Sequence, residues 1–287
     1  MLGILASIID GVLVGLVYGL AAMGLTLIWG VMDVINLTHG TMIVIGMFAL
    51  WLLASMLGLS PYLALPPVAI GAFIVGIALY WVAVHRMVGQ PPLMSLLSTF
   101  AVNLVLVGVG TAVWGTALFN VDVAVPGISM GRYTFPGAHI LAAILAAVIA
   151  FLLYLFLQYS RWGKAVRAVA NNREAAELVG IPTTRVLAFT VGCGVALAGV
   201  SGMLIATLFP FTVLSGDSYQ LKSFVVTVLG GFGNPVGALL GGIALGLLEG
   251  AVTPFVPVSW TLVIEFVLFV LVLIAFPGGV FTRRRSP

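Results

Sequence analysis

The chain has 287 residues, of which 62% are hydrophobic and 7% are charged, and its formal net charge is +3. Soluble domains carry about 25% charged residues, so this composition excludes a soluble protein and indicates an integral membrane protein. The small basic excess does not point to nucleic acid, because the basic residues cluster in loops beside apolar stretches, where they orient membrane helices.

Long, continuous apolar runs predict helices that cross a lipid bilayer. A membrane helix needs roughly 20 mostly apolar residues, whereas a barrel strand alternates in polarity over about ten. We therefore expect an all-α, polytopic helical bundle in which 1–287 form one transmembrane domain. The expected helices, about eight in number, are 4–29, 40–58, 65–84, 93–118, 138–158, 186–209, 222–251 and 259–277, and 119–137 is expected to be an external loop.

Two interruptions of the apolar pattern predict broken or re-entrant segments, near 30–40 and near 230–235. The second has the sequence Gly-Gly-Phe-Gly-Asn-Pro, and glycine and proline break helices. Irregular backbone at membrane depth is tolerated only where it is buried in protein or lines a wet cavity. Each break is therefore a candidate part of a pathway across the membrane.

The basic residues also predict the orientation of the chain. His85-Arg86, the loop at 158–185 and the tail Arg283-Arg284-Arg285 are expected on the cytoplasmic side. The N-terminus then lies outside and the C-terminus inside. Because the loop and the tail lie on the same side, an even number of crossings must separate them. This holds if 222–251 is split at its break into two membrane segments. The total number of crossings is then either eight or nine.

Two glycine ladders lie near the ends of the chain. Their members are Gly11, Gly15 and Gly19, and Gly242, Gly246 and Gly250. A spacing of four residues places the glycines on one helix face, where they let another helix approach closely. We interpret both ladders as packing surfaces.

The loop at 158–185 is a charged, helix-favouring island in an apolar chain. Five of the eleven basic residues fall between Arg161 and Arg185. The pattern predicts one amphipathic helix over 161–180, in which Arg173 and Glu177 pair along the helix. Such a segment on the cytoplasmic side is expected to contact a partner there.

Asn36, Thr38, His39 and Asn234 are the candidate residues of the translocation path. A polar group inside the membrane is costly unless it has a partner, and it is a functional candidate for that reason. The alternative is that these side chains cap broken helix ends, as Asn and Thr do well, and for Thr38 capping is the preferred interpretation. Further candidates are Asp33, Glu249 and Glu265, the last two expected near the outer interface.

Several enzyme classes find no support in the sequence. The phosphate-binding pattern Gly-x-x-x-x-Gly-Lys-Ser/Thr does not occur, so the chain is not expected to hydrolyse ATP itself. Gly199-Val-Ser201-Gly202 matches a short intramembrane-protease pattern, but all three histidines precede Ser201, which argues against that class. We expect no catalytic residues, no cofactor and no metal site.

The segment Arg173-Glu174-Ala175-Ala176-x-x-x-Gly180 resembles the cytoplasmic loop motif of permease subunits in bacterial ABC importers. The resemblance implies that Arg173, Glu174, Ala175, Ala176 and Gly180 dock on an ATPase. The continuation departs from the wider motif, because Ile181-Pro182-Thr183-Thr184 lacks the usual downstream leucine and proline.

Nearly the whole chain resembles the branched-chain amino-acid (LIV-type) permease family, and Thr38, where alanine is common, is a departure. The matching segments are 15–25, 30–40, 163–176, 228–238 and 277–281. The resemblance implies an inner-membrane permease with two ATPase subunits, a second permease subunit and an external binding protein as partners. Permeases for amides, urea or aromatic acids, and a stand-alone secondary transporter, remain the alternatives.

Overall fold

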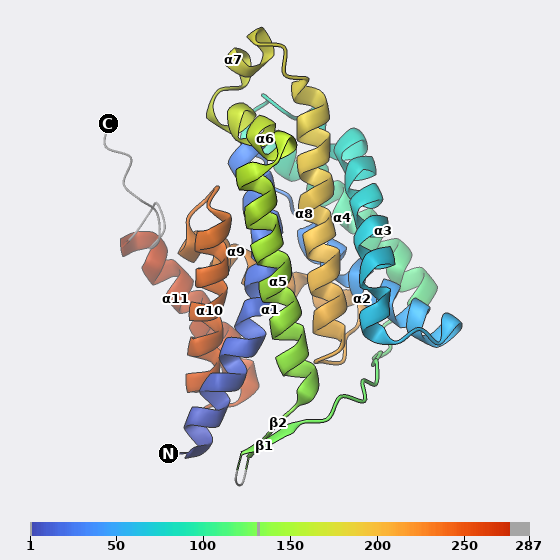
Figure 1. Cartoon of the computed structure of the whole chain (residues 1–287), viewed down its shortest axis with the longest axis vertical. Coiled ribbons are helices and arrows are strands. Elements are labelled where there is room, and N and C mark those ends of the chain that lie inside the picture. Colours follow the sequence, from blue (N-terminus) through green and yellow to red (C-terminus); the bar gives the residue numbers. More distant parts are fainter. Residues whose placement is uncertain (1, 131–132, 276–287) are drawn as a thin grey trace.

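The computed structural model describes residues 2–130 and 133–275, which form a helical bundle (Figure 1). Within them, seven helices are long and apolar enough to cross a membrane, and the predicted polytopic helical class is confirmed. The long helices are α1 (Leu2–Met32), α2 (His39–Leu57), α3 (Leu65–Leu79), α4 (Pro92–Trp114), α5 (Gly137–Tyr159), α8 (Thr183–Ala206), α9 (Gly216–Gly230), α10 (Pro235–Val252) and α11 (Val258–Ala275). Shorter elements are the helices α6 (Arg161–Asn171) and α7 (Arg173–Leu178), the strands β1 (Ile128–Met130) and β2 (Tyr133–Phe135), and the single turns Pro61–Ala64, Tyr80–Val84 and Val213–Ser215.

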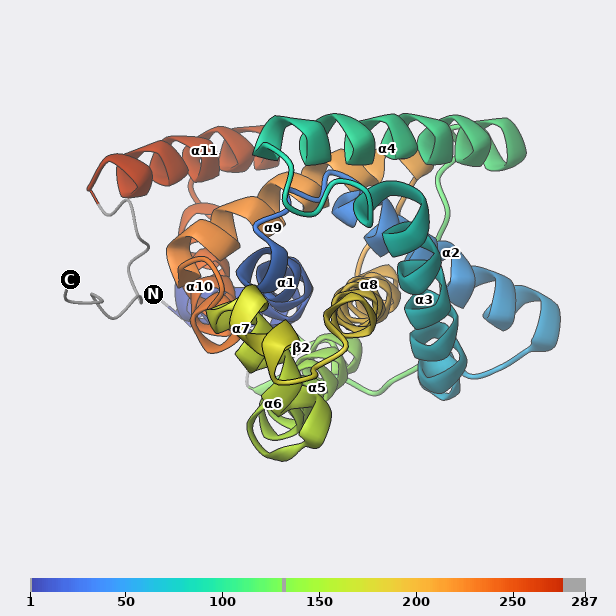
Figure 2. The ribbon, with the colours of Figure 1, turned by 90° about the horizontal axis from the view of Figure 1, so that it is seen from above.

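Helices α1 and α8 form the centre of the bundle. Seen from above, α1 is flanked by α10, α9 and α5, and α8 lies between α1 and α3 (Figure 2). The most apolar stretch of α8 is 83% buried, whereas that of α4 is 11% buried. Because small residues dominate α8, its neighbours approach closely. Helix α4, by contrast, presents most of its apolar surface outward.

The two predicted glycine ladders pack against each other. Helix α10 runs antiparallel to α1, and the backbone of each helix fills the space beside the glycines of the other. A Cβ at Gly15 would overlap the carbonyl oxygen of Gly242, and one at Gly242 would overlap the backbone of Gly19. The packing interpretation of both ladders is therefore confirmed.

Both predicted breaks are present. Helix α1 ends at Met32 and α2 begins at His39, while 222–251 divides into α9 and α10 around residues 231–234. Helices α9 and α10 run in opposite directions, and α8, α9, α10 and α11 follow the charged loop up to residue 275, while the number of crossings and the orientation stay predictions. The tail Arg283-Arg284-Arg285 and the matching segment 277–281 lie outside the described residues.

Two local expectations were wrong. The helix predicted at 93–118 ends at Trp114, because Gly115 has a φ of 67° that a continuing helix cannot adopt. The single helix predicted at 161–180 is divided into α6 and α7. The segment 119–137, predicted to be a loop, contains a short antiparallel hairpin of β1 with β2.

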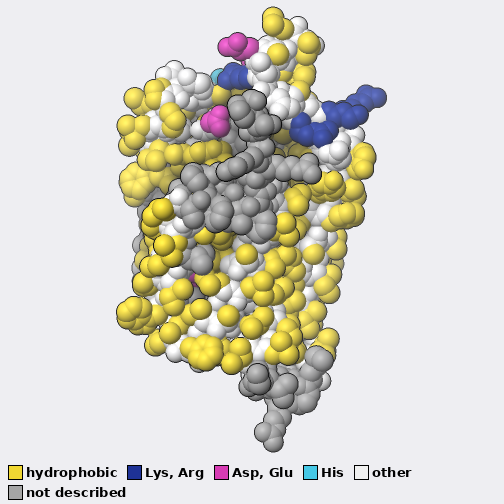
Figure 3. All heavy atoms as spheres, turned by 90° about the vertical axis from the view of Figure 1, so that its left-hand side faces the viewer, with side chains coloured by type: hydrophobic (Ala, Val, Ile, Leu, Met, Phe, Trp, Pro, Cys, Tyr) yellow, Lys and Arg dark blue, Asp and Glu magenta, His cyan; other side chains and the backbone are white. Residues whose placement is uncertain are grey.

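The ends of the bundle differ in charge. The N-terminal end of α1 and the hairpin lie at one end, and α6 and α7 lie at the other (Figure 1). Figure 3 shows one side of the molecule, where hydrophobic side chains cover a broad middle zone and the Lys, Arg, Asp and Glu side chains gather mainly at one end. This distribution matches a protein that crosses a bilayer.

Candidate functional site

Helix α6 lies across one end of the bundle with its apolar side inward. Ser160 caps it, since its hydroxyl oxygen accepts a hydrogen bond from the Gly163 amide at 2.8 Å. Val166 and Val169 are buried, while Arg161 and Lys164 are exposed. The sequence thus anchors this helix through valines and leaves its charges in water.

Helix α7 projects beyond the rest of the bundle (Figure 1). The side-chain oxygen of Asn172 accepts a hydrogen bond from the Ala175 amide at 2.9 Å and caps the helix. Of its residues only Ala176 is buried, whereas Leu178 is 88% exposed and the following Val179 is 76% exposed. A protruding apolar surface of this kind suits contact with another protein.

A small polar network fixes the far end of α7. The Glu177 carboxylate accepts hydrogen bonds from the Thr183 hydroxyl at 2.6 Å and from Arg173 at 3.3 Å, so the predicted Arg173–Glu177 pair is confirmed. These two donors hold the pKa of Glu177 below its usual value. Gly180 has a φ of 83° and reverses the chain into α8.

The five predicted coupling residues therefore have different local roles. Arg173 pairs with Glu177, Ala176 packs on the bundle, and Gly180 forms the turn. Ala175 supplies the capped amide. Glu174 is exposed and, within the described part of the chain, has no ion pair. The division of the predicted helix follows from Asn172, which is in an extended conformation and ends α6 while capping α7.

Asn36, Thr38 and His39 come together at the first break and are fully buried. The Asn36 side-chain oxygen accepts hydrogen bonds from the Thr38 amide at 3.1 Å and the Thr38 hydroxyl at 2.6 Å. His39 Nε2 lies 3.0 Å from the Ala21 carbonyl oxygen, which can only accept, so this nitrogen carries a proton. Helix α1 ends at Met32, and the following residue, Asp33, has a φ of 53°.

Capping of α2 by the Thr38 side chain, the preferred prediction, was wrong. Thr38 stands at the N-cap position but its hydroxyl bonds to Asn36 instead. Gln220 of α9 satisfies the helix start, because its side-chain oxygen accepts from the Gly40 amide at 2.5 Å. Its amide nitrogen also donates to the Asn36 carbonyl at 3.3 Å, so α9 closes over this break.

The neighbouring helix α4 also supports the first break. The Thr99 hydroxyl accepts from the Leu37 amide at 3.1 Å, and its one hydrogen faces the carbonyl oxygens of Ser95 at 2.9 Å and Ile35 at 3.0 Å. Asn103 pairs with Thr41 of α2. The backbone groups of this irregular segment therefore find hydrogen-bond partners inside the protein, as non-helical backbone within a membrane must. Sequence reasoning missed Thr99 and Gln220, since both partners lie far along the chain.

Asn234 lies at the second break and is a helix cap. Its side-chain oxygen accepts from the Gly237 amide at 3.0 Å at the start of α10. Its hydrogen bonds do not reach Asn36, Thr38 or His39, so the four predicted path residues form two separate groups.

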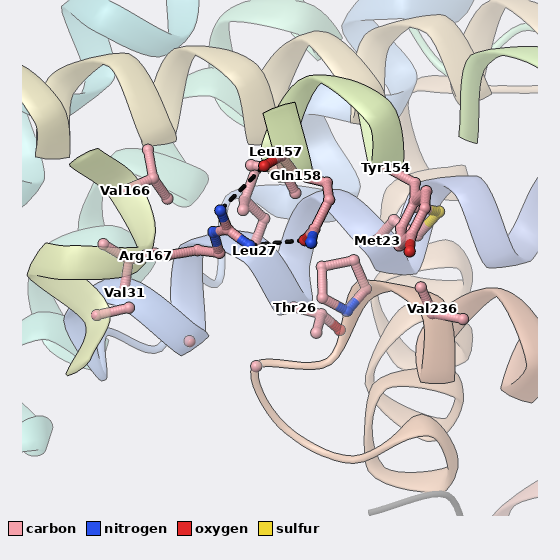
Figure 4. A pocket seen from close by; sticks show the side chains of 14 residues that line it. Met23, Thr26, Leu27, Val31, Tyr154, Leu157, Gln158, Val166, Arg167 and Val236 are labelled. Atoms are coloured by element: carbon pink, nitrogen blue, oxygen red, sulfur yellow. Dashed lines mark hydrogen bonds between the residues drawn. The ribbon is translucent and has the colours of Figure 1, made fainter. Parts of the chain in front are cut away.

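The ends of the two breaks nevertheless meet. The Trp29 and Phe232 rings stack with centroids 4.7 Å apart, and Gly30 packs on the backbone of Gly233. A cavity of about 210 Å³ opens here between α1, α5, α6 and the start of α10 (Figure 4). Arg167 reaches its rim from α6 and donates to the Gln158 side-chain oxygen at 2.6 Å and to the Gln158 carbonyl at 3.0 Å. The charged segment thus forms one wall of a cavity that both breaks line.

A charged cluster lies toward the end opposite α6 and α7. Lys222 of α9 donates to Glu249 of α10 and, at 3.1 Å, to Glu265 of α11. The position of the two glutamates near the outer interface stays a prediction, and within the protein Glu265 is buried. Sequence reasoning did not single out Lys222, although a lone lysine between apolar runs was the available signal.

The family model described as "Branched-chain amino acid transport system / permease component" matches residues 7–273. The chain is 30% identical to the high-affinity branched-chain amino acid transport system permease protein LivH of Salmonella typhimurium, over 97% of this chain and 96% of that protein. It is 29% identical to the permease protein BraD of Pseudomonas aeruginosa, with the same coverage. No solved structure matches the chain.

A third relative is the probable LivH permease of Methanocaldococcus jannaschii, which is 26% identical over 91% of this chain. The family match covers the charged segment, both breaks and the charged cluster alike. The chain therefore belongs to the family of branched-chain amino-acid transport system permease components.

Proposed function

We propose that this chain is the transmembrane permease subunit of an ABC importer for branched-chain or related amino acids. It forms the translocation pathway and couples that pathway to separate ATPase subunits. Membership of the permease family and the names of the relatives support this function. In this proposal the separate ATPase subunits hydrolyse ATP, and this chain does not.

The observation that carries the coupling role is the exposed α7. An apolar tip at Leu178 and Val179 stands outside the bundle, and the Glu174 carboxylate is exposed beside it. An ATPase surface with a groove and a basic rim would cover both. The end that bears α6 and α7 is then cytoplasmic, the N-terminus is outside, and the C-terminus is inside.

The path of coupling runs through α6. A pull on α7 acts on Asn172 and then on α6, which the buried Val166 and Val169 hold against the bundle. Because Arg167 of α6 lies on the cavity that Gly30 and Gly233 line, displacement of α6 changes the cavity where the two breaks meet. Asn36, Thr38 and His39 are sealed in this structure, so we assign them to the closed part of the pathway.

The proposed partners are two ATPase subunits, a second permease subunit and an external substrate-binding protein, in a bacterial inner membrane. Gentle affinity purification of the tagged chain from native membranes, followed by mass spectrometry, tests this assembly. Recovery of an ATPase and a second permease supports the importer. Recovery of the chain alone, with uptake driven by an ion gradient, favours a stand-alone secondary transporter.

A charge reversal tests the docking role of α7. Glu174→Lys should lower both ATPase recovery and ATP-dependent uptake at least tenfold, with an unchanged amount of the chain in the membrane. Asp122→Lys is the matched control, because Asp122 is also exposed but lies in the segment near the hairpin at the other end. Unchanged uptake by Glu174→Lys would contradict the docking role.

A further inference from the structure

A second cavity, of about 380 Å³, lies at the end of the bundle opposite α6 and α7. It is lined by residues of α1, α10 and α11 and by Lys222 of α9, including Asp10, Tyr18, Glu249 and Glu265. The volume falls within the roughly 300–1,000 Å³ range of small-molecule sites. Ionisable groups at membrane depth are functional candidates, and here both signs of charge face one cavity.

Lys222 is the centre of this charged cluster. Its ammonium donates to both glutamates and lies 4.8 Å from the centroid of the Tyr18 ring. The Lys222 and Glu249 side chains are each 15% exposed, and that of Glu265 is 4% exposed. Three different helices supply these three groups, so the packing of α9, α10 and α11 creates the cluster.

Structural pairing alone does not explain the number of carboxylates. One glutamate would be enough to neutralise Lys222, and a second buried carboxylate adds negative charge where charge is costly. Asp10 adds a third carboxylate to the same cavity, and its oxygen lies 2.6 Å from Nδ1 of His139. The cavity therefore offers acceptors for a cationic group in addition to Lys222.

We propose that this cavity binds the zwitterionic head of an α-amino acid, with the ligand carboxylate on Lys222 and the ligand ammonium on Glu249 and Glu265. Val14, Tyr18 and Phe209 line the cavity and receive an apolar side chain. This inference rests on the proposed function and sharpens its substrate class. Urea and simple amides lack both charges, so they could form no ion pair with Lys222, Glu249 or Glu265.

Binding to the unaltered full-length chain tests the chemistry without any mutation. Tritiated L-leucine is bound to the purified chain in lipid nanodiscs and displaced by 4-methylpentanoate, which lacks the ammonium, or by isoamylamine, which lacks the carboxylate. We expect saturable L-leucine binding, displacement by each analogue at least tenfold weaker than by L-leucine, and none by urea. Absence of saturable binding, or equal displacement by either analogue, would overturn the proposal.

Two variants then locate the site. Lys222→Met should weaken L-leucine binding at least tenfold, and Glu265→Gln, which preserves shape, should weaken it similarly if the first variant does not fold. Lys164→Met is the matched control, since Lys164 is the only other lysine in the chain, is exposed on α6, and meets no ATPase in this assay. Full binding by both cluster variants would overturn the site.

The outcomes separate the site from the proposed function. ATP-driven uptake of amino acids without binding at the cluster would remove the site and keep the importer. Binding at the cluster in a chain that recovers no ATPase would keep the site and remove the importer.

Discussion

Gly11 of α1 and Gly246 of α10 meet backbone to backbone, so that a Cβ added to either would overlap the carbonyl oxygen of the other. The contact repeats one turn along at Gly15 and Gly242. Close approach of this kind gains dispersion and backbone contacts that lipid cannot replace. The contact fixes α10, and with it Glu249, against the N-terminal half of α1.

Substitution at this contact should destabilise the chain. Gly246→Ala forces α1 and α10 apart, and overpacking of this kind typically costs about 1–3 kcal/mol. Gly108→Ala is the matched control, because a Cβ at Gly108 meets open space and alanine favours a helix by about 1 kcal/mol. Thermal unfolding in detergent should show a lower midpoint for Gly246→Ala only. Equal midpoints would contradict the packing role.

The cap of α7 gives a second prediction. Asn172→Ala removes the side-chain oxygen that accepts from the Ala175 amide, and loss of an N-cap costs about 1 kcal/mol. We expect faster amide hydrogen exchange in residues 173–178 and little change in α8. The adjacent Asn171→Ala keeps the cap and should exchange like the unaltered chain. Identical exchange in both variants would show that α7 does not depend on its cap.

The Glu177 network predicts a pH effect. The Thr183 hydroxyl and Arg173 lower the folded-state pKa of Glu177 below its ordinary 4.5. A lowered carboxyl pKa means that this network stabilises the fold above pH 4.5 and that the stabilisation is lost as the pH falls through the folded pKa. Thr183→Val should therefore move the Glu177 titration to higher pH.

Carbon-13 NMR of labelled glutamate can follow this titration, since the chain has only four glutamates. Thr184→Val is the matched control, because Thr183 and not Thr184 bonds to Glu177. A Glu177 titration that moves equally in both variants, or in neither, would contradict the assigned cause.

Thr99 gives a prediction for the first break. Thr99→Val removes the hydroxyl oxygen that accepts from the Leu37 amide, and an unsatisfied buried group costs about 1–3 kcal/mol. We expect a lower unfolding midpoint and greater solvent access to residues 33–38. Thr111→Val on the same helix is the comparison, and an equal loss of stability there would argue against a specific role for Thr99.

Much of the fold could be predicted because lipid leaves the backbone few choices. Without water to satisfy its amides, the chain must form helices wherever it crosses, and glycine and proline mark where they stop. The break beside Gly231 was found this way, and the break after Met32 was found from polar residues between two apolar runs. The division of α6 from α7 was missed, although Asn172 directly precedes Arg173, Glu174 and Ala175 as a typical N-cap.

The partners of the polar groups could not be predicted, because they depend on which helices meet. Gln220 caps α2 from 180 residues away, and Asp10 pairs with His139 across 129 residues. No local periodicity encodes such pairings. For the same reason the bond between Lys222 of α9 and Glu265 of α11 could not be predicted from the sequence.

The stacked rings of Trp29 and Phe232 have a consequence for movement. They join the end of α1 to the turn between α9 and α10, so neither interrupted segment can shift without breaking the same aromatic contact. Packed contacts of this sort switch between discrete arrangements and do not yield gradually. Relative movement of the two interrupted segments beside α6 therefore depends on this one aromatic contact.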